Sequence, residues 1–209
     1  MRVILFDLYG LFVVPSEPLE TVSGPSGWEP ELFWRHWMGP LRHVYNAGLV
    51  SDAEFGAMVE EAAGRELADL EAVVAADVAL CHTYDNALIA FVQELHARGV
   101  RTGLLSNITA AEAVRQRELS PWFELFDPLC LSCDIHAAKP EPEAFHIALS
   151  GFGTEMDPAD VLFLDDTVEN LETAHRLGFA THHYLDVTGA RNAIEQHLLG
   201  QRVCFETAR

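Results

Sequence analysis

Short apolar segments recur along the chain and predict five buried strands. They cover residues 3–6, 102–105, 128–131, 161–164 and 180–184. From Gly99 onward these segments alternate with others whose apolar residues recur every three or four positions, which is typical of amphipathic helices. Those segments cover residues 110–119, 142–149, 168–177 and 190–199. The alternation predicts an α/β fold with a Rossmann-like, doubly wound parallel sheet that carries helices on both faces.

The segment between the first two strands has a different pattern. Residues 29–77 show helical periodicity only, and residues 86–98 are predicted to form the helix that returns the chain to the sheet. Residues 17–27 are rich in Pro, Gly and Ser, which indicates a linker. We therefore predict a core domain of residues 1–14 and 86–209, and a small inserted helical cap domain of residues 15–85.

Composition and charge narrow the class of partner. Hydrophobic residues make up 49% of the chain, enough for a packed core. The formal net charge of −19 argues against nucleic acid, because binding requires Lys and Arg to neutralise phosphates. No apolar run approaches the roughly 20 residues that span a bilayer, and the N-terminus shows no signal-peptide pattern. We expect a cytoplasmic protein with no membrane partner, either a monomer or a homodimer.

The chain contains four cysteines, namely Cys81, Cys130, Cys133 and Cys204. Cys130 and Cys133 have the CxxC spacing of a zinc half-site or redox pair, but no second half-site accompanies them. They are interpreted as plain strand-end cysteines in a reducing compartment.

Polar residues stand where the predicted strands end. They are Asp7, Ser106, Asn107, Lys139, Asp165 and Asp166. Taken singly, each has a simpler explanation as a turn former, a helix cap or a solvated loop residue. Together they occupy the carboxyl ends of parallel strands, where ligands bind in open α/β sheets.

This set of side chains suits phosphoryl transfer. A carboxylate can attack phosphorus and form an aspartyl-phosphate, which divides the reaction into two easier steps. Clustered carboxylates repel one another, so they call for a hard cation such as Mg²⁺, which prefers oxygen ligands. A lysine and a helix N-terminus can hold the oxygens of the transferring group. The sequence therefore favours a small phosphorylated molecule as substrate.

The motifs FDLYG, LLSN, AAKPEPEAF and FLDDTVEN resemble, in this order, the four motifs of the haloacid dehalogenase (HAD) superfamily of hydrolases. The resemblance covers nearly the whole chain, and four motifs in order make it specific. The helical insert is similar to the C1 cap of subfamily I. The resemblance implies that this insert closes over the site, excludes water and selects the substrate.

The resemblance implies a Mg²⁺ site and a nucleophile. The implied metal ligands are Asp7, the backbone carbonyl of Tyr9, Asp165 and Asp166, with Asp165 binding directly or through water. Asp7 would also be the nucleophile.

The same resemblance implies roles for four further residues. Ser106 and the backbone of Asn107 would hold the phosphoryl group, and Lys139 would balance charge on the nucleophile and the transferring group. Asn170, the last residue of the DDxxxN pattern, would support the loop of the fourth motif.

Tyr9 departs from the pattern of the family's phosphatases. Most of them carry a second aspartate at this position, which protonates the leaving group and then activates water. A phenol with an ordinary pKa near ~10 is a poor general base at neutral pH. Leu11 also replaces the small residue that often follows the glycine.

Three hypotheses follow from this departure. The first is a Mg²⁺-dependent phosphatase for a small ester with a good leaving group, such as a sugar phosphate. The second is a metal-independent 2-haloacid dehalogenase, whose first motif reads like FDxYGT and which uses an arginine to bind substrate, here Arg35 or Arg42. The third is a catalytically degenerate domain with a binding role. The adjacent acids Asp165 and Asp166 favour the first, because the dehalogenases carry neutral residues there.

Aromatic residues cluster in the predicted cap. They are Trp28, Phe33, Trp34, Trp37 and Tyr45. Their helical spacing predicts a packed core rather than a substrate pocket.

Overall fold

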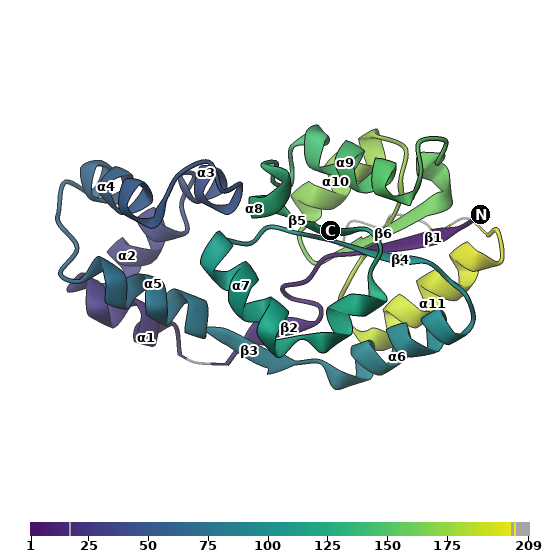
Figure 1. The fold of residues 1–209 in the computed structure, drawn as a ribbon, viewed down its shortest axis with the longest axis horizontal. Coiled ribbons are helices and arrows are strands. Elements are labelled where there is room, and N and C mark those ends of the chain that lie inside the picture. The colour runs from purple at the N-terminus through teal and green to yellow at the C-terminus, as the bar shows by residue number, and fades with distance from the viewer. Residues whose placement is uncertain (17, 202, 204–209) are drawn as a thin grey trace.

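The computed structural model describes residues 1–16, 18–201 and 203, so Glu17 and Cys204 lie outside the described residues. Five parallel strands form the central sheet in the order β5-β4-β1-β6-β7, as Figure 1 shows. Their bounds are β1 Val3–Phe6, β4 Thr102–Ser106, β5 Leu129–Leu131, β6 Val161–Asp165 and β7 Ala180–His183. The central strand β1 is buried along its whole length, as expected for a parallel sheet covered on both faces. The predicted α/β fold is confirmed.

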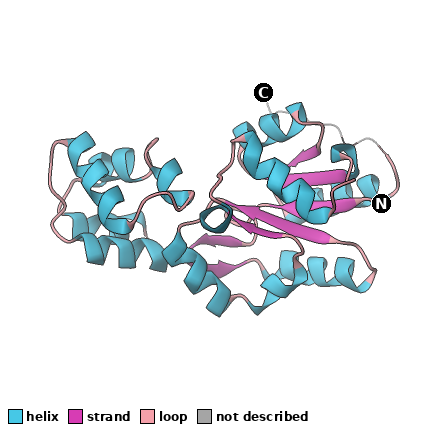
Figure 2. Cartoon of the chain, turned by 45° about the horizontal axis from the view of Figure 1, so that its top comes forward, coloured by secondary structure: helices cyan, strands magenta, loops and turns pink. Residues whose placement is uncertain are grey.

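Alternate residues of β1 pack against different helix layers. Ile4 and Phe6 join a cluster with α6 (Asn86–Ala97) and α11 (Val187–Leu198). Val3 and Leu5 join the opposite cluster, with α9 (Pro142–Phe152) and α10 (Val168–Arg176). The two layers lie on the two sides of the sheet in Figure 2. None of the helices in the described ranges is long and apolar enough to cross a membrane.

The inserted helices form a separate body beside the sheet (Figure 1). They are α1 Leu19–Ser23, α2 Pro30–Trp37, α3 Arg42–Asn46, α4 Asp52–Ala63 and α5 Leu70–Ala79. They pack around their own apolar cluster, which includes Phe33, Trp37 and Phe55. The linker prediction for residues 17–27 is wrong for its described part. Residues 19–23 are helical and Val22 is fully buried in this cluster, so local composition is overridden by packing.

A second, two-stranded sheet was not predicted. β2 (Val13–Pro15) pairs antiparallel with β3 (Cys81–Tyr84), and Val13 lies opposite Tyr84. Both strands are short, and β3 is partly exposed without an alternating pattern, so periodicity gave no signal. These strands carry the chain into and out of the helical insert. The domain boundaries at residues 15 and 85 stay a prediction.

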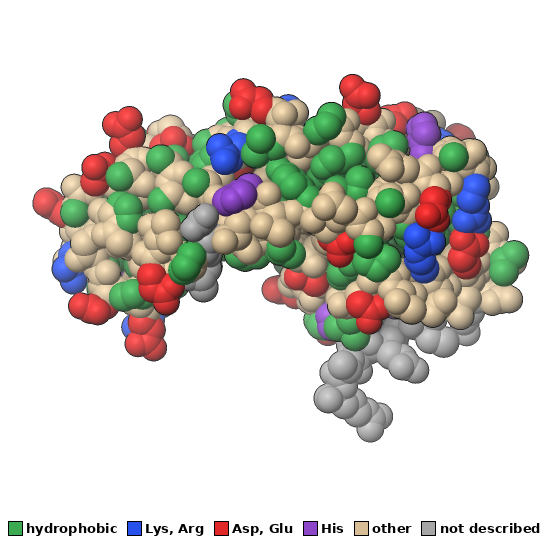
Figure 3. Space-filling view, turned by 90° about the horizontal axis from the view of Figure 1, so that it is seen from below, with side chains coloured by type: hydrophobic (Ala, Val, Ile, Leu, Met, Phe, Trp, Pro, Cys, Tyr) green, Lys and Arg blue, Asp and Glu red, His purple; other side chains and the backbone are tan. Residues whose placement is uncertain are grey.

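The remaining helical elements divide between the two bodies, and the turn Gly24–Ser26 packs with α1 and α5 of the insert. They are α7 Ala110–Leu119, α8 Ser132–Ile135, and the 3₁₀ turns η1 Gly24–Ser26, η2 Pro121–Leu125 and η3 Pro158–Asp160. Helix α11 begins three residues before the predicted start, because the Asp186 side chain accepts a hydrogen bond from the backbone N–H of Gly189. The face in Figure 3 shows acidic side chains over both bodies and few basic ones, consistent with the net charge of −19.

Candidate active site

The carboxyl ends of three neighbouring strands lie at the same edge of the sheet, and two of them lead to the first carboxylates. Phe6 lies opposite Leu104 of β4 and Leu164 of β6, so the ends of these strands are neighbours. The backbone N–H of Asp7 continues the pattern by donating to the carbonyl of Leu164 at 2.9 Å. Asp165 is the last residue of β6. The sheet therefore places Asp7 and Asp165 side by side.

Lys139 lies between these two carboxylates. Its Nζ is 2.6 Å from Asp7 Oδ1 and 2.7 Å from Asp165 Oδ2, and its side chain is 1% exposed. Asn107 fixes the lysine's backbone: its Nδ2 donates to the Lys139 carbonyl and its Oδ1 accepts from the Lys139 N–H, both at 2.7 Å. This direct support of the lysine loop by the Asn107 side chain was not predicted.

The loop after β6 is held by its own hydrogen bonds. Asn170 Nδ2 donates to Asp165 Oδ2 at 3.0 Å, and the backbone N–H of Thr167 donates to Asp165 Oδ1 at 2.7 Å. Asp166 is exposed, and its Oδ1 accepts from Thr167 Oγ1 at 3.2 Å. Asp165 is thus buried and tied to the protein, while Asp166 lines the cavity and is exposed.

The carboxylates of Asp7, Asp165 and Asp166 converge on one point. One oxygen from each lies within 4.8 Å of the others. Gly10, at φ +80°, makes this approach possible, because a Cβ there would lie 2.0 Å from Asp166 Oδ2. An all-oxygen donor set of this size fits Mg²⁺.

The electrostatics of the cluster also suit a cation. Burial raises the pKa of Asp7 to about 8; the Lys139 ammonium opposes this rise and the Asp165 charge adds to it. Burial, with the charge of Asp165, raises the pKa of Asp166. Burial lowers the pKa of Lys139, but Asp165 and Asp7 together raise it above its usual value. One ammonium thus faces three carboxylates, and a divalent cation would offset the excess negative charge.

A cavity of about 600 Å³ connects this cluster to the helical insert. Among the predicted site residues, those that line it are Asp7, Tyr9, Asn107, Lys139, Asp166 and Asn170. Ser106 lies at the same end of the sheet but is not one of the described lining residues. Its Oγ is buried and has no hydrogen-bond partner within the described ranges.

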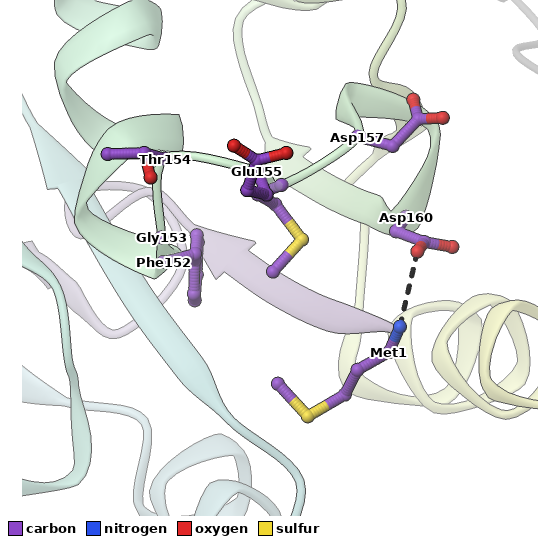
Figure 4. A pocket seen from close by; sticks show the side chains of 8 residues that line it. Met1, Phe152, Gly153, Thr154, Glu155, Asp157 and Asp160 are labelled. Carbon is purple, nitrogen blue, oxygen red and sulfur yellow. Dashed lines mark hydrogen bonds and ion pairs between the residues drawn. The ribbon is translucent and has the colours of Figure 1, made fainter.

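A second cavity, of about 430 Å³, lies at the other end of β1 (Figure 4). Its polar contact is an ion pair between the Met1 amine and Asp160 at 3.3 Å, which Figure 4 draws. The side chains in view do not converge on a common point, so this cavity lacks the arrangement found beside Asp7.

The wall formed by the insert contains a buried ionic cluster that sequence reasoning missed. Arg42 Nη1 is 2.6 Å from Asp77 Oδ2, and Arg42 Nη2 is 3.5 Å from Glu112 Oε1 on α7. Trp37 Nε1 donates to Asp77 at 3.1 Å, and Arg42 Nε donates to Asn46 at 3.0 Å. We call Arg42, Asp77 and Glu112 the cap cluster. No local sequence motif predicts the cap cluster, because its members come from three helices.

Two predictions about the insert are modified by this arrangement. Arg42 does line the cavity, but its guanidinium is occupied by two carboxylates, and Arg35 is exposed and is not among the described lining residues. Phe33 and Trp37 are fully buried, as predicted for core aromatics, whereas Trp34 lines the cavity.

Tyr9 also lines the cavity, and its phenol is held neutral. Burial and the nearby charge of Glu112 raise the pKa of Tyr9 well above its usual value. Its Oη is buried and lacks a hydrogen-bond partner in the part of the chain that the structure describes. The side chain therefore cannot serve as a base near neutral pH.

Comparison with known proteins places these features in context. A family model described as haloacid dehalogenase-like hydrolase matches residues 1–178. A sesquiterpene phosphatase of Aspergillus oryzae is 28% identical over 106 residues, which is 51% of this chain and 53% of that protein. This chain thus spans about half the length of that relative.

Two solved structures share the fold. A HAD-like family hydrolase from Porphyromonas gingivalis is 26% identical, with a TM-score of 0.73 over 95% of this chain and 98% of that one. A HAD family enzyme from Bacteroides thetaiotaomicron, in complex with magnesium and inorganic phosphate, is 22% identical, with a TM-score of 0.71 over 91% of this chain and 98% of that one.

Proposed function

The chain belongs to the haloacid dehalogenase-like hydrolases, and we propose that it is a Mg²⁺-dependent phosphatase that cleaves a small phosphate monoester through an aspartyl-phosphate on Asp7. The observation that carries the proposal is the convergence of three carboxylates beside a buried lysine. A sugar phosphate, named above as an example, belongs to this class of esters.

In the first step, a carboxylate oxygen of Asp7 attacks phosphorus, and the bond from phosphorus to the leaving oxygen breaks. Lys139, 2.6 Å from Asp7, holds the nucleophile in place and balances its charge. The Ser106 hydroxyl and the backbone of Asn107 would hold the phosphoryl oxygens. Water then hydrolyses the acyl phosphate and restores Asp7.

Mg²⁺ would be held by Asp7, the Tyr9 carbonyl, Asp165 and Asp166, and when bound it supplies positive charge to the phosphoryl oxygens. Asn170 would keep Asp165 oriented, because its amide donates to both carboxylate oxygens, at 3.2 and 3.0 Å. The Mg²⁺ and phosphate in the Bacteroides structure and the phosphatase name of the Aspergillus relative support this assignment.

The two alternatives have less support. A haloacid dehalogenase would need a cation for the substrate carboxylate, but Arg42 is paired with Asp77 and Glu112. A purely binding role would not require a lysine between two carboxylates. A cytoplasmic location and a monomeric or homodimeric state stay predictions of the sequence.

A phosphate-ester panel with and without Mg²⁺ tests the proposal. We expect p-nitrophenyl phosphate to be hydrolysed with Mg²⁺, and activity to vanish with chelator and return with added Mg²⁺. Metal-independent chloride release from 2-chloropropionate would instead establish the dehalogenase. Inactivity toward both classes, with no Mg²⁺ binding by calorimetry, would favour the binding role.

A further inference from the structure

The part of the cavity that would receive the leaving group has an apolar wall beside the cap cluster and Asn46. Val13, Pro15, Trp34, Met38 and Leu80 line it. Two polar atoms on its lining residues, Tyr9 Oη and Trp34 Nε1, are buried beneath other atoms rather than presented to a ligand. Sugar hydroxyls placed against these apolar side chains would lose water without gaining partners, which is unfavourable. An apolar group would gain by burial.

The cavity also lacks a spare positive charge. Within the described ranges, its lining cations are Lys139 and Arg42. Lys139 is held by Asp7 and Asp165, and Arg42 by Asp77 and Glu112. In both clusters carboxylates outnumber the cation, so a second anionic group on the substrate would be repelled.

The leaving group must also depart without an acid at position 9. The side chain at position 9 is a phenol, with an ordinary pKa near ~10, and is a far weaker acid than a carboxylic acid. Its Oη is buried and has no hydrogen-bond partner within the described residues. The lining acids Asp77 and Glu112 are engaged with Arg42. A phenolate, with a conjugate-acid pKa near ~10, leaves unaided far more easily than an alkoxide, whose conjugate acid is about as weak as water at about 15.7.

We infer that the substrates are aryl monophosphates, in which the phosphate is carried by an uncharged aromatic alcohol. This inference rests on the proposed phosphatase function. The Asp7 oxygen bonds to phosphorus, the phosphorus–aryl oxygen bond breaks, and the aryl oxide keeps the electron pair and is protonated by solvent. Water then cleaves the acyl phosphate, giving inorganic phosphate and free Asp7. The aromatic ring lies against Trp34 and Leu80, which line the cavity.

The test compares kcat/KM, by phosphate release with Mg²⁺, for phenyl phosphate, 4-carboxyphenyl phosphate, hexyl phosphate and glucose 6-phosphate. The expected result is a preference of about tenfold or more for phenyl phosphate over each of the others. The 4-carboxyphenyl ester is the sharpest comparison, because its better leaving group would make it faster if the carboxylate were tolerated. Equal or better turnover of this ester, or of glucose 6-phosphate, overturns the inference.

A charge added to the cavity provides a second measurement. Met38 lines the cavity and is 53% exposed, so Met38→Lys adds a cation without disturbing packing. We expect it to lower the ratio of kcat/KM for phenyl phosphate to kcat/KM for 4-carboxyphenyl phosphate by about threefold or more. Leu49→Lys adds the same charge at an exposed cap position outside the described cavity lining, and is expected to leave the ratio unchanged. Equal ratios in both variants would contradict the charge argument.

The dependence on the leaving group separates this inference from the function on which it rests. Across neutral substituted phenyl phosphates, kcat/KM should fall steeply as the phenol pKa rises, because no acid assists departure. A flat dependence overturns the inference while the phosphatase stands. No hydrolysis of any ester, p-nitrophenyl phosphate included, would reject the phosphatase itself.

Discussion

Two buried ionic clusters flank the same cavity, and they use their carboxylates differently. Beside the sheet, Asp7 and Asp165 share Lys139, and one oxygen of each lies within 4.8 Å of one from Asp166. In the cap cluster, Asp77 and Glu112 share Arg42. In both clusters the carboxylates outnumber the cations. Among the described residues, however, only the carboxylates beside the sheet lie close enough together to hold a metal ion.

The difference lies in what satisfies the oxygens. Asp77 receives the Trp37 indole N–H and the Arg42 guanidinium, and Glu112 receives the N–H and hydroxyl of Thr109 in a helix-capping box. The exposed Asp166 carboxylate accepts a hydrogen bond from the side-chain hydroxyl of its neighbour Thr167 and has no ion pair among the described residues. A carboxylate whose oxygens already accept hydrogen bonds from the protein contributes to packing. A carboxylate with free oxygens is available to bind a ligand.

The largest expected effect tests the sheet cluster. Asp7→Asn should reduce turnover of p-nitrophenyl phosphate by on the order of 10⁴-fold or more, because the nucleophile is lost. Steady-state kinetics with Mg²⁺ measures this. Retention of more than a tenth of the activity would remove Asp7 from the mechanism.

The next effect tests the cap cluster. Arg42→Met should lower the free energy of unfolding by about 3–5 kcal/mol, because Asp77 and Glu112 would remain buried without their cation. Urea denaturation measures it. The matched control is Arg35→Met on the exposed side of α2, which should change stability by about 0.5 kcal/mol or less. Similar values for the two variants would show that the cap cluster does not stabilise the fold.

A smaller effect sharpens the assignment of the metal site. Gly10→Ala should weaken Mg²⁺ binding by about tenfold or more in calorimetry, because its Cβ would displace Asp166. Gly64→Ala introduces the same kind of backbone strain, at φ +64°, but its Cβ meets no atom within 4 Å. It should cost stability while leaving Mg²⁺ affinity unchanged. Equal affinity in both variants would argue against Asp166 as a ligand.

The last prediction concerns the pH dependence of stability in the metal-free protein. The pKa of Asp7 is raised from 3.8 to about 8 in the folded state, so folding favours its protonated form. This contribution is fully present below the unfolded pKa and is lost as pH rises through about 8. Between pH 5 and 8, stability should therefore decline more steeply in the wild type than in Asp7→Asn, as chemical denaturation would show. Identical slopes would contradict the raised pKa.

Much of the sheet could be predicted because β1 and most of β6 are apolar runs and β4 and β5 carry short apolar segments, whereas β7, with the sequence ATHH, gives a weaker signal. The helices that cover the sheet carry regular apolar positions, and Asp7, Ser106 and Asp165 stand at strand ends, where parallel topology makes them neighbours. These signals are local in the sequence, and parallel pairing of the strands is enough to bring the strand-end residues together.

The side of the cavity that the helical insert forms could not be predicted in the same way. Arg42 and Asp77 are 35 residues apart, and Glu112 belongs to a helix of the other body. Their pairing depends on how α3, α5 and α7 pack, and no spacing rule records that. The apolar lining likewise combines β2, α2 and the end of α5, so its character emerges only from three-dimensional assembly.

The pairing of β2 with β3 also bears on how such a protein can evolve. Val13 and Tyr84 lie opposite each other, so the helical insert leaves and re-enters the chain at adjacent points. An insert of different length or lining could replace it wherever the two ends keep this spacing, with no change to the strands that carry Asp7 and Asp165. The β2–β3 ribbon thus provides an insertion point at which the helical insert, and with it the recognition surface, can change in evolution while the reactive centre stays the same.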